Sequence, residues 1–183
     1  MSRVIYYVAS SLDGFIADAD DSLDWLLSQE LTPGGGNDYT AFIADIGAIA
    51  MGSTTYEWVL AHGEWSYDMP AWVLTTRALG QPERTASGAP ADVRFARGPV
   101  GDVHAAMLAA ADGGDLWVVG GGDLAGQFAD AGLLDEIHIS IAPVTLGAGR
   151  PLLPRRLDLE LLEQGTNGAF ATARYAVRRA AAR

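Results

Sequence analysis

The residues with the clearest chemical potential are three consecutive glycines, Gly120, Gly121 and Gly122, which lie between an apolar run and a helical pattern. Glycines at such a junction let backbone amides approach a phosphate closely, and the positive end of the helix dipole favours its negative charge. A tight strand-to-helix turn needs one glycine or two, so a third favours phosphate contact over a purely structural turn.

The same segment satisfies the G-x-G-x-x-A form of the dinucleotide fingerprint through Gly120, Gly122 and Ala125. An ordinary Rossmann unit has this fingerprint near the start of its domain and an acidic residue at the end of the next strand. Here the next apolar run leads into Pro-Val-Thr at 143–145, without an acidic residue. The pattern therefore predicts a phosphate site outside the ordinary Rossmann arrangement.

Two further strand ends carry residues that suit an anion. Residues 52–54 (Gly-Ser-Thr) follow one apolar run, and residues 75–77 (Thr-Thr-Arg) follow another, where two hydroxyls and a guanidinium could hold a phosphate monoester. Each segment alone could be an ordinary helix cap or a solvated loop. Because ligands gather at the carboxyl ends of parallel strands, the three segments together favour a nucleotide-binding edge.

Other chemically capable residues give weaker signals. Asp13 precedes a glycine and is typical of a turn, although a catalytic carboxylate there stays open. Trp25 could be a core aromatic residue or a platform for a substrate. His62, His104 and His138 lack the spacing of metal ligands, so we expect no metal site.

The elements that must position these residues alternate between apolar runs and helical patterns, which is typical of parallel strands joined by crossover helices. We expect strands over 4–11, 48–51, 72–75, 93–95, 116–119 and 137–142. At the end of the chain, 157–161 alternates with period two, and Asn167-Gly168 predicts a hairpin turn into 170–177. The sequence thus predicts an α/β fold whose mostly parallel sheet ends in an antiparallel hairpin.

Capping signals place three helices between these strands. Asp38 is expected to cap a helix that ends at Ala44, with Gly47 just beyond it. Residues 54–57 have the form of a capping box, and the helix they begin would stop at 62–63. Asp102 is expected to cap a third helix that buries Val103, Met107, Leu108 and Ala111.

Composition limits the function classes. The 183 residues include no cysteine, and all 12 basic residues are arginine, which excludes thiol nucleophiles, disulfides and lysine Schiff bases. A net charge of −11 argues against nucleic-acid and anionic membrane surfaces. The first residues read as a strand rather than a signal peptide, so we expect a cytoplasmic protein. We expect one domain over 1–178 and a frayed tail over 179–183.

Taken together, the motifs resemble the dihydrofolate reductase superfamily, and most closely its riboflavin-biosynthesis reductase branch in stand-alone form. The matching segments, in family order, are 11–17 (SLDGFIA), 51–57 (MGSTTYE), 118–122 (VVGGG), 132–137 (GLLDEI) and 141–152 (IAPVTLGAGRPL). The resemblance implies a dihydrofolate-reductase-like three-layer sandwich, NADPH as hydride donor and a homodimer.

The resemblance also implies roles for particular residues. Asp13 would be catalytic, and Trp25 and Arg150 would contact a small heterocyclic substrate, whose phosphate Arg155 and Arg156 could also approach. The nicotinamide, the pyrophosphate and the adenosine 2′-phosphate would be held by Ala9, Ile16, Gly52, Ser53, Thr54, Thr75, Thr76, Arg77, Gly120, Gly121, Gly122 and Leu124.

The implied reaction is hydride transfer to a C=N or C=O group of a pterin-like or ribosylaminopyrimidine substrate. Dihydrofolate reduction ranks second, because alignment on Trp25 places Ser22 where the folate enzymes have a carboxylate. A nucleotide-binding or sensor protein without catalytic activity is the alternative from another class. It would share the glycine sites and differ only in turnover.

Overall fold

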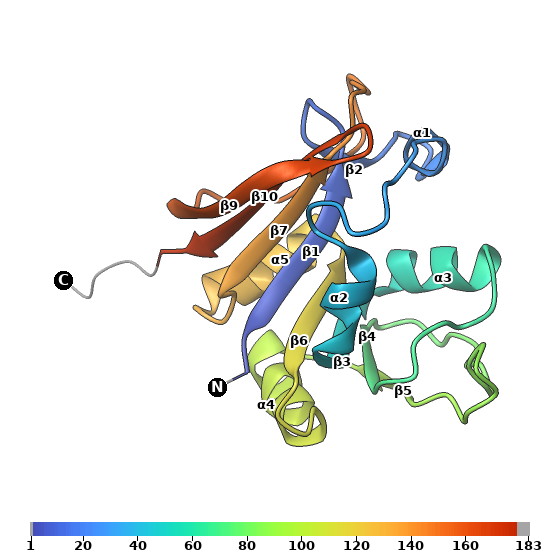
Figure 1. Cartoon of the computed structure of the whole chain (residues 1–183). Helices are drawn as coiled ribbons and strands as arrows, with labels where there is room; N and C mark the ends of the chain where they lie inside the picture. Colours follow the sequence, from blue (N-terminus) through green and yellow to red (C-terminus); the bar gives the residue numbers. More distant parts are fainter. Residues whose placement is uncertain (1, 179–183) are drawn as a thin grey trace.

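The computed structural model describes residues 2–178 and is built around an eight-stranded sheet (Figure 1). Its order is β5-β4-β3-β6-β1-β7-β10-β9. The bounds are β1 (Val4–Ser10), β3 (Ile46–Gly52), β4 (Ala71–Leu74), β5 (Val93–Ala96), β6 (Asp115–Gly120), β7 (Glu136–Ile141), β9 (Leu159–Asn167) and β10 (Phe170–Val177). The strands from β5 to β7 in this order pair in parallel, whereas β10 pairs antiparallel with both β7 and β9.

Helices cover both faces of the sheet, as Figure 1 shows. They are α1 (Asp24–Leu27), α2 (Tyr39–Ala44), α3 (Ser53–Ala61), α4 (Val100–Ala110) and α5 (Gly122–Asp130). Helices α4 and α5 pack on one face through residues such as Met107 and Phe128, both fully buried. On the other face, Tyr56 of α3 and Phe42 of α2 pack with Trp117 of β6. This α/β/α arrangement confirms the predicted three-layer sandwich.

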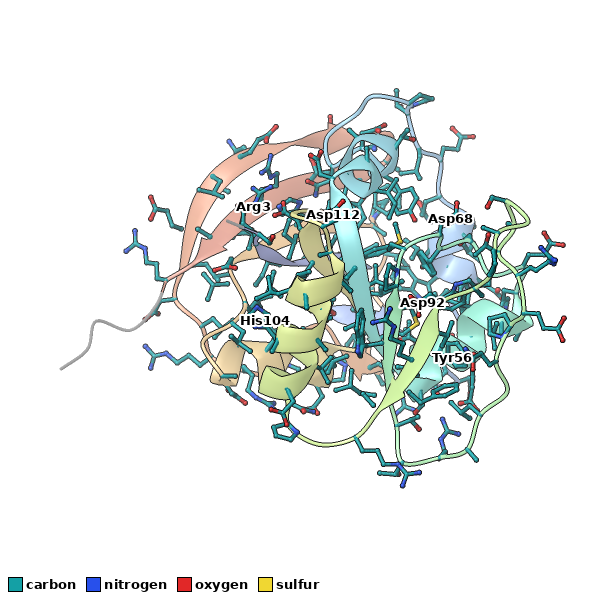
Figure 2. All side chains as sticks on the ribbon, turned by 90° about the horizontal axis from the view of Figure 1, so that it is seen from below. Arg3, Tyr56, Asp68, Asp92, His104 and Asp112 are labelled. Atoms are coloured by element: carbon teal, nitrogen blue, oxygen red, sulfur yellow. The ribbon has the colours of Figure 1, made fainter. Side chains whose placement is uncertain are left out.

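The core forms where apolar side chains alternate to the two faces of the strands. Val4 and Tyr6 of β1 belong to the core below α4 and α5, while Tyr7 contacts the opposite core. The ring of Tyr56 lies beside β5, with its centroid 5.7 Å from that of Phe95 (Figure 2). Burial of both apolar faces is the dominant stabilising term for such a sheet.

The hairpin at the end of the chain is confirmed. Strand β9 ends at Asn167, Gly168 has a φ of +56°, and β10 begins at Phe170. A short second sheet joins β2 (Phe15–Ala17) to β8 (Arg150–Pro151), which ties the segment after β1 to the one before β9. The sequence patterns did not indicate this pair, because each strand has only two or three residues.

Two predicted helix starts are wrong. Helix α3 begins at Ser53 after Gly52, so Thr54 is not the cap residue and no capping box forms. Glu57 pairs with Arg77 instead. Helix α4 begins at Val100 after Pro99, so Asp102 lies in the first turn rather than at the cap, and Leu108 is 40% exposed.

The cap of α2 is confirmed, since Asp38 accepts a hydrogen bond from the Ala41 amide. Gly47, however, lies inside β3 rather than after a helix, where a side chain would collide with the Ala111 carbonyl. The expected frayed tail, 179–183, lies outside the described residues. Among the helices of residues 2–178, none has both the length and the apolar character that crossing a bilayer requires.

Candidate active site

A cleft of about 1270 Å³ opens at the carboxyl ends of the central parallel strands. Residues of α1, α3, α5 and the β2–β8 pair also line it. Every residue expected to bind the cofactor is among its lining residues, as is Arg150. The cofactor set comprises Ala9, Ile16, Gly52, Ser53, Thr54, Thr75, Thr76, Arg77, Gly120, Gly121, Gly122 and Leu124.

Two helices direct their amino termini into this cleft. Helix α5 follows Gly121 and helix α3 follows Gly52, and neither of these cap positions supplies a side-chain hydrogen bond. The first backbone N–H groups of each helix are therefore left for another acceptor. Such termini attract anions through both the free N–H groups and the helix dipole.

The three glycines before α5 differ in what surrounds them. A Cβ on Gly122 would collide with the carbonyls of Pro151 and Leu152, so β8 requires glycine there. A Cβ on Gly120 would lie 3.1 Å from the Thr55 hydroxyl. Gly121 has no atom within 4 Å of its Cβ position, and it lines the cleft. The packing of the fold therefore explains two of the glycines, and the third borders open space.

A basic end of the cleft lies after β4 and β5. The Arg77 guanidinium contacts the Glu57 carboxylate at 2.5 Å, and its backbone N–H donates to the Thr75 hydroxyl. Arg97 donates to the Thr76 carbonyl at 3.0 Å and has no ion pair with a described carboxylate. Sequence reasoning missed Arg97, although its place directly after a strand repeats the pattern of Arg77.

The opposite end of the cleft is aromatic. Tyr7, Tyr39 and Tyr67 line it together with Trp117, and their ring centroids lie 6.1, 6.0 and 5.7 Å from that of Trp117. No local sequence pattern distinguishes any of these four residues. Tyr7 is in β1, Tyr39 in α2, Trp117 in β6, and Tyr67 in the loop that precedes β4, so only the tertiary fold brings them together.

Of the three cations expected near a substrate phosphate, Arg150 and Arg155 are paired, whereas Arg156 is exposed and does not line the cleft. The Arg150 guanidinium contacts both carboxylate oxygens of Asp21, at 2.5 and 2.7 Å. Arg155 contacts Asp123 at 2.9 Å and Asp130 at 2.7 Å. The contact between Arg155 and Asp123 offsets the negative charge that Asp123 would otherwise place at the amino terminus of α5.

Asp13 and Trp25 do not line the cleft. The Asp13 carboxylate accepts hydrogen bonds from the Ser11 hydroxyl and from the amides of Leu146 and Gly147. The Ser11 hydroxyl lowers the carboxyl pKa most, and the two amides lower it further. Trp25 donates from its indole nitrogen to the Ser22 carbonyl. These contacts hold Asp13 in the turn after β1 and Trp25 in α1, so contact of either residue with a ligand stays a prediction.

Comparison with known proteins agrees with this geometry. The chain is 33% identical over 152 residues to the uncharacterised protein YwjB of Bacillus subtilis, covering 82% of each chain. A protein of Shewanella sp. PV-4, provisionally assigned to riboflavin biosynthesis, superposes with a TM-score of 0.80 at 27% identity, covering 98% of this chain and all of that one. Dihydrofolate reductase of Enterococcus faecalis, solved with NADP(H), gives 0.61 at 14% identity over 97% of both chains, which shows a shared fold.

A family model agrees with these likenesses and covers nearly the whole chain. The model of the RibD C-terminal domain matches residues 2–167, which includes every strand of the parallel sheet and every segment that lines the cleft. With its glycine-lined cleft at the strand ends, the chain therefore belongs to the RibD C-terminal domain family, whose affinities are with riboflavin-pathway-type reductases.

Proposed function

We propose that this protein is an NADPH-dependent reductase that transfers a hydride to a C=N or C=O carbon of a pterin-like or ribosylaminopyrimidine ring. The observation that carries the proposal is the open space at Gly121 in a cleft that two uncapped helix termini and two arginines, Arg77 and Arg97, also line. A dinucleotide phosphate needs donors at two separated points, and the cleft supplies them at both.

The residues present fit this cofactor in three places. The first amides of α5 and α3 would bind the pyrophosphate, with Gly121 allowing close approach. Arg77, Arg97 and the Thr75 hydroxyl would hold the 2′-phosphate. Ala9, at the end of β1, and Ile16, in β2, would lie on either side of the nicotinamide.

When bound, the dihydronicotinamide supplies the hydride, and the substrate nitrogen or oxygen takes a proton from water. Ala9, Ile16 and Val8 present apolar surface at this point of the cleft, which would exclude bulk water from the reacting carbon. Asp13 would act at a distance, by fixing the turn that positions Ile16.

The test is a fluorescence titration of the protein with NADPH and with NADH. We expect NADPH to bind more tightly, and Gly121→Val to abolish binding because its side chain would enter the open space. Gly63→Val is the matched control, since Gly63 also has no atom within 4 Å of its Cβ position and lies outside the cleft. Failure of folded wild-type protein to bind either nucleotide would overturn the proposal.

A second step separates an enzyme from a binding protein. NADPH consumption is followed with 7,8-dihydropterin, dihydrofolate and a ribosylaminopyrimidine. Oxidation of NADPH with 7,8-dihydropterin or with the ribosylaminopyrimidine supports the proposed reaction. Faster oxidation of NADPH with dihydrofolate would favour folate reduction instead. Tight nucleotide binding without oxidation in any mixture would favour the non-catalytic sensor.

A further inference from the structure

The aromatic end of the cleft contains hydroxyl groups that the fold itself does not use. Tyr7 donates its hydroxyl hydrogen to the Asn37 carbonyl at 2.6 Å, and the indole of Trp117 donates to the Tyr7 carbonyl at 3.1 Å. These two residues are therefore fixed by the protein. Tyr39 and Tyr67 are different, because neither hydroxyl has a hydrogen-bond partner within residues 2–178.

Tyr67 is the stronger observation of the two. Its side chain is only 8% exposed, packed between Trp65 and Trp117 at centroid distances of 5.0 and 5.7 Å, and it lines the cleft. Trp65 Nε1, and not the Tyr67 hydroxyl, is the fully buried polar atom without a partner in the described residues, so the Tyr67 hydroxyl reaches the surface of the cleft. Its ring is held in place by packing, and its hydroxyl is left to donate to a molecule bound in the cleft. Tyr39 lines the same part of the cleft and is 45% exposed.

The charged groups that line the cleft argue against a substrate that carries a phosphate. Arg150, the lining cation in β8 of the small sheet, is held by both oxygens of Asp21. Arg77 and Arg97 follow β4 and β5, at the end assigned to the nucleotide. Among the described lining residues, the aromatic end thus has no cation free to pair with a second phosphate.

Resting on the proposed reductase function, we propose that Tyr39 and Tyr67 anchor the reducible substrate, and that this substrate is an uncharged planar heterocycle without a phosphate group. The two hydroxyls would donate to ring carbonyl or ring nitrogen acceptors. Trp117 and the tyrosine rings provide the apolar surface against which such a ring packs.

The hydroxyls suit donation rather than proton transfer. Burial raises the pKa of Tyr67, and the nearby Tyr39 raises it further, so the phenol stays protonated through the physiological range. A neutral phenol can orient and polarise a carbonyl acceptor, while water provides the proton that balances the hydride. Asp38, whose charge acts on Tyr7, caps α2, and Asp21 and Arg150, which also line the cleft, are paired with each other.

The experiment compares 6-hydroxymethylpterin with its phosphate monoester, two probes that differ only in the phosphate. Binding is measured by quenching of pterin fluorescence, with and without saturating NADP⁺, so that no turnover occurs. We expect the unphosphorylated pterin to bind more tightly, by a factor on the order of tenfold, because the phosphate would remain unpaired in an acidic protein. Tighter binding of the phosphate, or no binding of either pterin, would overturn the inference.

Variants identify the anchors. Tyr67→Phe and Tyr39→Phe remove only a hydroxyl and should each weaken pterin binding about 3- to 10-fold, the usual value of one hydrogen bond. Their NADP⁺ affinity should equal that of the wild type. Tyr175→Phe, on β10 away from the cleft, is the matched control. Wild-type pterin affinity in both cleft variants would rule out the anchoring role.

The same titrations separate the two proposals. Absence of NADP⁺ binding in the wild type would contradict the proposed function. Pterin binding measured without nucleotide would still test whether Tyr39 and Tyr67 hold the substrate. Normal NADP⁺ binding together with a preference for the phosphorylated pterin would contradict this inference alone.

Discussion

Neighbouring glycines at the start of α5 meet different surroundings, and this difference separates folding from binding at the level of single residues. Gly122 is confined by the Pro151 and Leu152 carbonyls, while Gly121 faces open space in the cleft. Its backbone, with φ −81° and ψ 176°, is extended and accessible to any residue. An added methyl group should therefore have opposite consequences at the two positions.

We predict that Gly122→Ala destabilises the protein by about 1–3 kcal/mol, as overpacking does, because β8 must shift to admit the methyl group. Gly121→Ala should leave the free energy of unfolding within about 0.5 kcal/mol of the wild type. Its Kd for NADPH should nevertheless rise on the order of tenfold, or about 1.4 kcal/mol. Urea unfolding and NADPH titration measure the two effects, and equal destabilisation of both variants would contradict the assignment.

The two arginines after β4 and β5 differ in how freely they can meet a phosphate. Arg97→Ala removes a guanidinium that no carboxylate of residues 2–178 pairs with. It should weaken NADPH binding about tenfold, near the lower limit for a charge-assisted hydrogen bond because the site is exposed. NADH affinity should stay unchanged, since NADH lacks the 2′-phosphate. Arg84→Ala, exposed and outside the cleft, is the control.

Glu57→Gln tests the same end from the opposite direction. Removing the carboxylate frees Arg77 from its ion pair and removes a negative charge beside the expected phosphate. NADPH affinity should rise, and NADH affinity should stay constant. The measurement is the NADPH affinity divided by the NADH affinity, compared between the wild type and Glu57→Gln. A lower ratio in Glu57→Gln would place the 2′-phosphate elsewhere.

At the scale of elements, the ends of strands were predictable and the convergence of aromatic residues was not. A strand followed by glycine or by Thr-Thr-Arg is a local pattern, and the parallel topology then places such ends at one edge. Tyr39, Tyr67 and Trp117 come from three segments with no shared periodicity, so their meeting depends on how α2 and the loop before β4 pack on β6.

Local signals also failed where a tertiary partner competed for the same side chain. The residue types at 54–57 fit a capping box, yet α3 begins earlier, after Gly52, and the Glu57 carboxylate binds Arg77, twenty residues further along the chain. Asp13 is a second example, because its carboxylate accepts hydrogen bonds from the amides of Leu146 and Gly147, 133 and 134 residues away, in addition to any bond within its own turn. Such long-range contacts carry no signature in a single sequence.

Asp13 connects the turn after β1 to the loop before β8, and its removal should loosen an element rather than stop a reaction. We predict that Asp13→Asn lowers Tm and raises the KM for NADPH, because Ile16 loses its fixed position, while kcat changes little. Asp20→Asn, an exposed change outside the cleft, controls for the altered charge. A large loss of kcat at unchanged KM would instead restore Asp13 as a catalytic residue.

At the scale of the whole molecule, a charged network joins the parallel sheet to the terminal hairpin. Arg3, at the edge where the parallel strands begin (Figure 2), contacts Asp115 at 2.5 Å and Glu136 at 2.9 Å. Glu136 also contacts Arg174 of β10 at 3.4 Å and His138 at 2.8 Å. Because His138 is only 7% exposed, its protonation state is coupled to folding.

The pKa shifts in this network set the direction of its response to acid. Burial lowers the pKa of His138 below the ordinary 6.5, and the hydrogen bond to Glu136 offsets this only in part. Burial acts to raise the pKa of Glu136, but the bonds from His138 and Arg3 outweigh it, so that pKa is lowered. Both groups therefore bind protons more readily in the unfolded chain than in the folded one, and both favour folding at neutral pH.

We predict that the contribution of His138 to the free energy of unfolding is complete above pH 6.5 and decreases below it, because the unfolded chain takes up a proton at this residue. A second decrease is expected below the ordinary glutamate pKa of 4.5, where Glu136 takes up a proton on unfolding in the same way. The first loss can reach at most about 1.4 kcal/mol per pH unit for one histidine. His138→Gln should flatten urea-unfolding free energies between pH 7 and 5, whereas His62→Gln, at an exposed site, should retain the wild-type slope. An identical slope in His138→Gln would assign the acid response to His104, because burial also lowers the pKa of that histidine below 6.5.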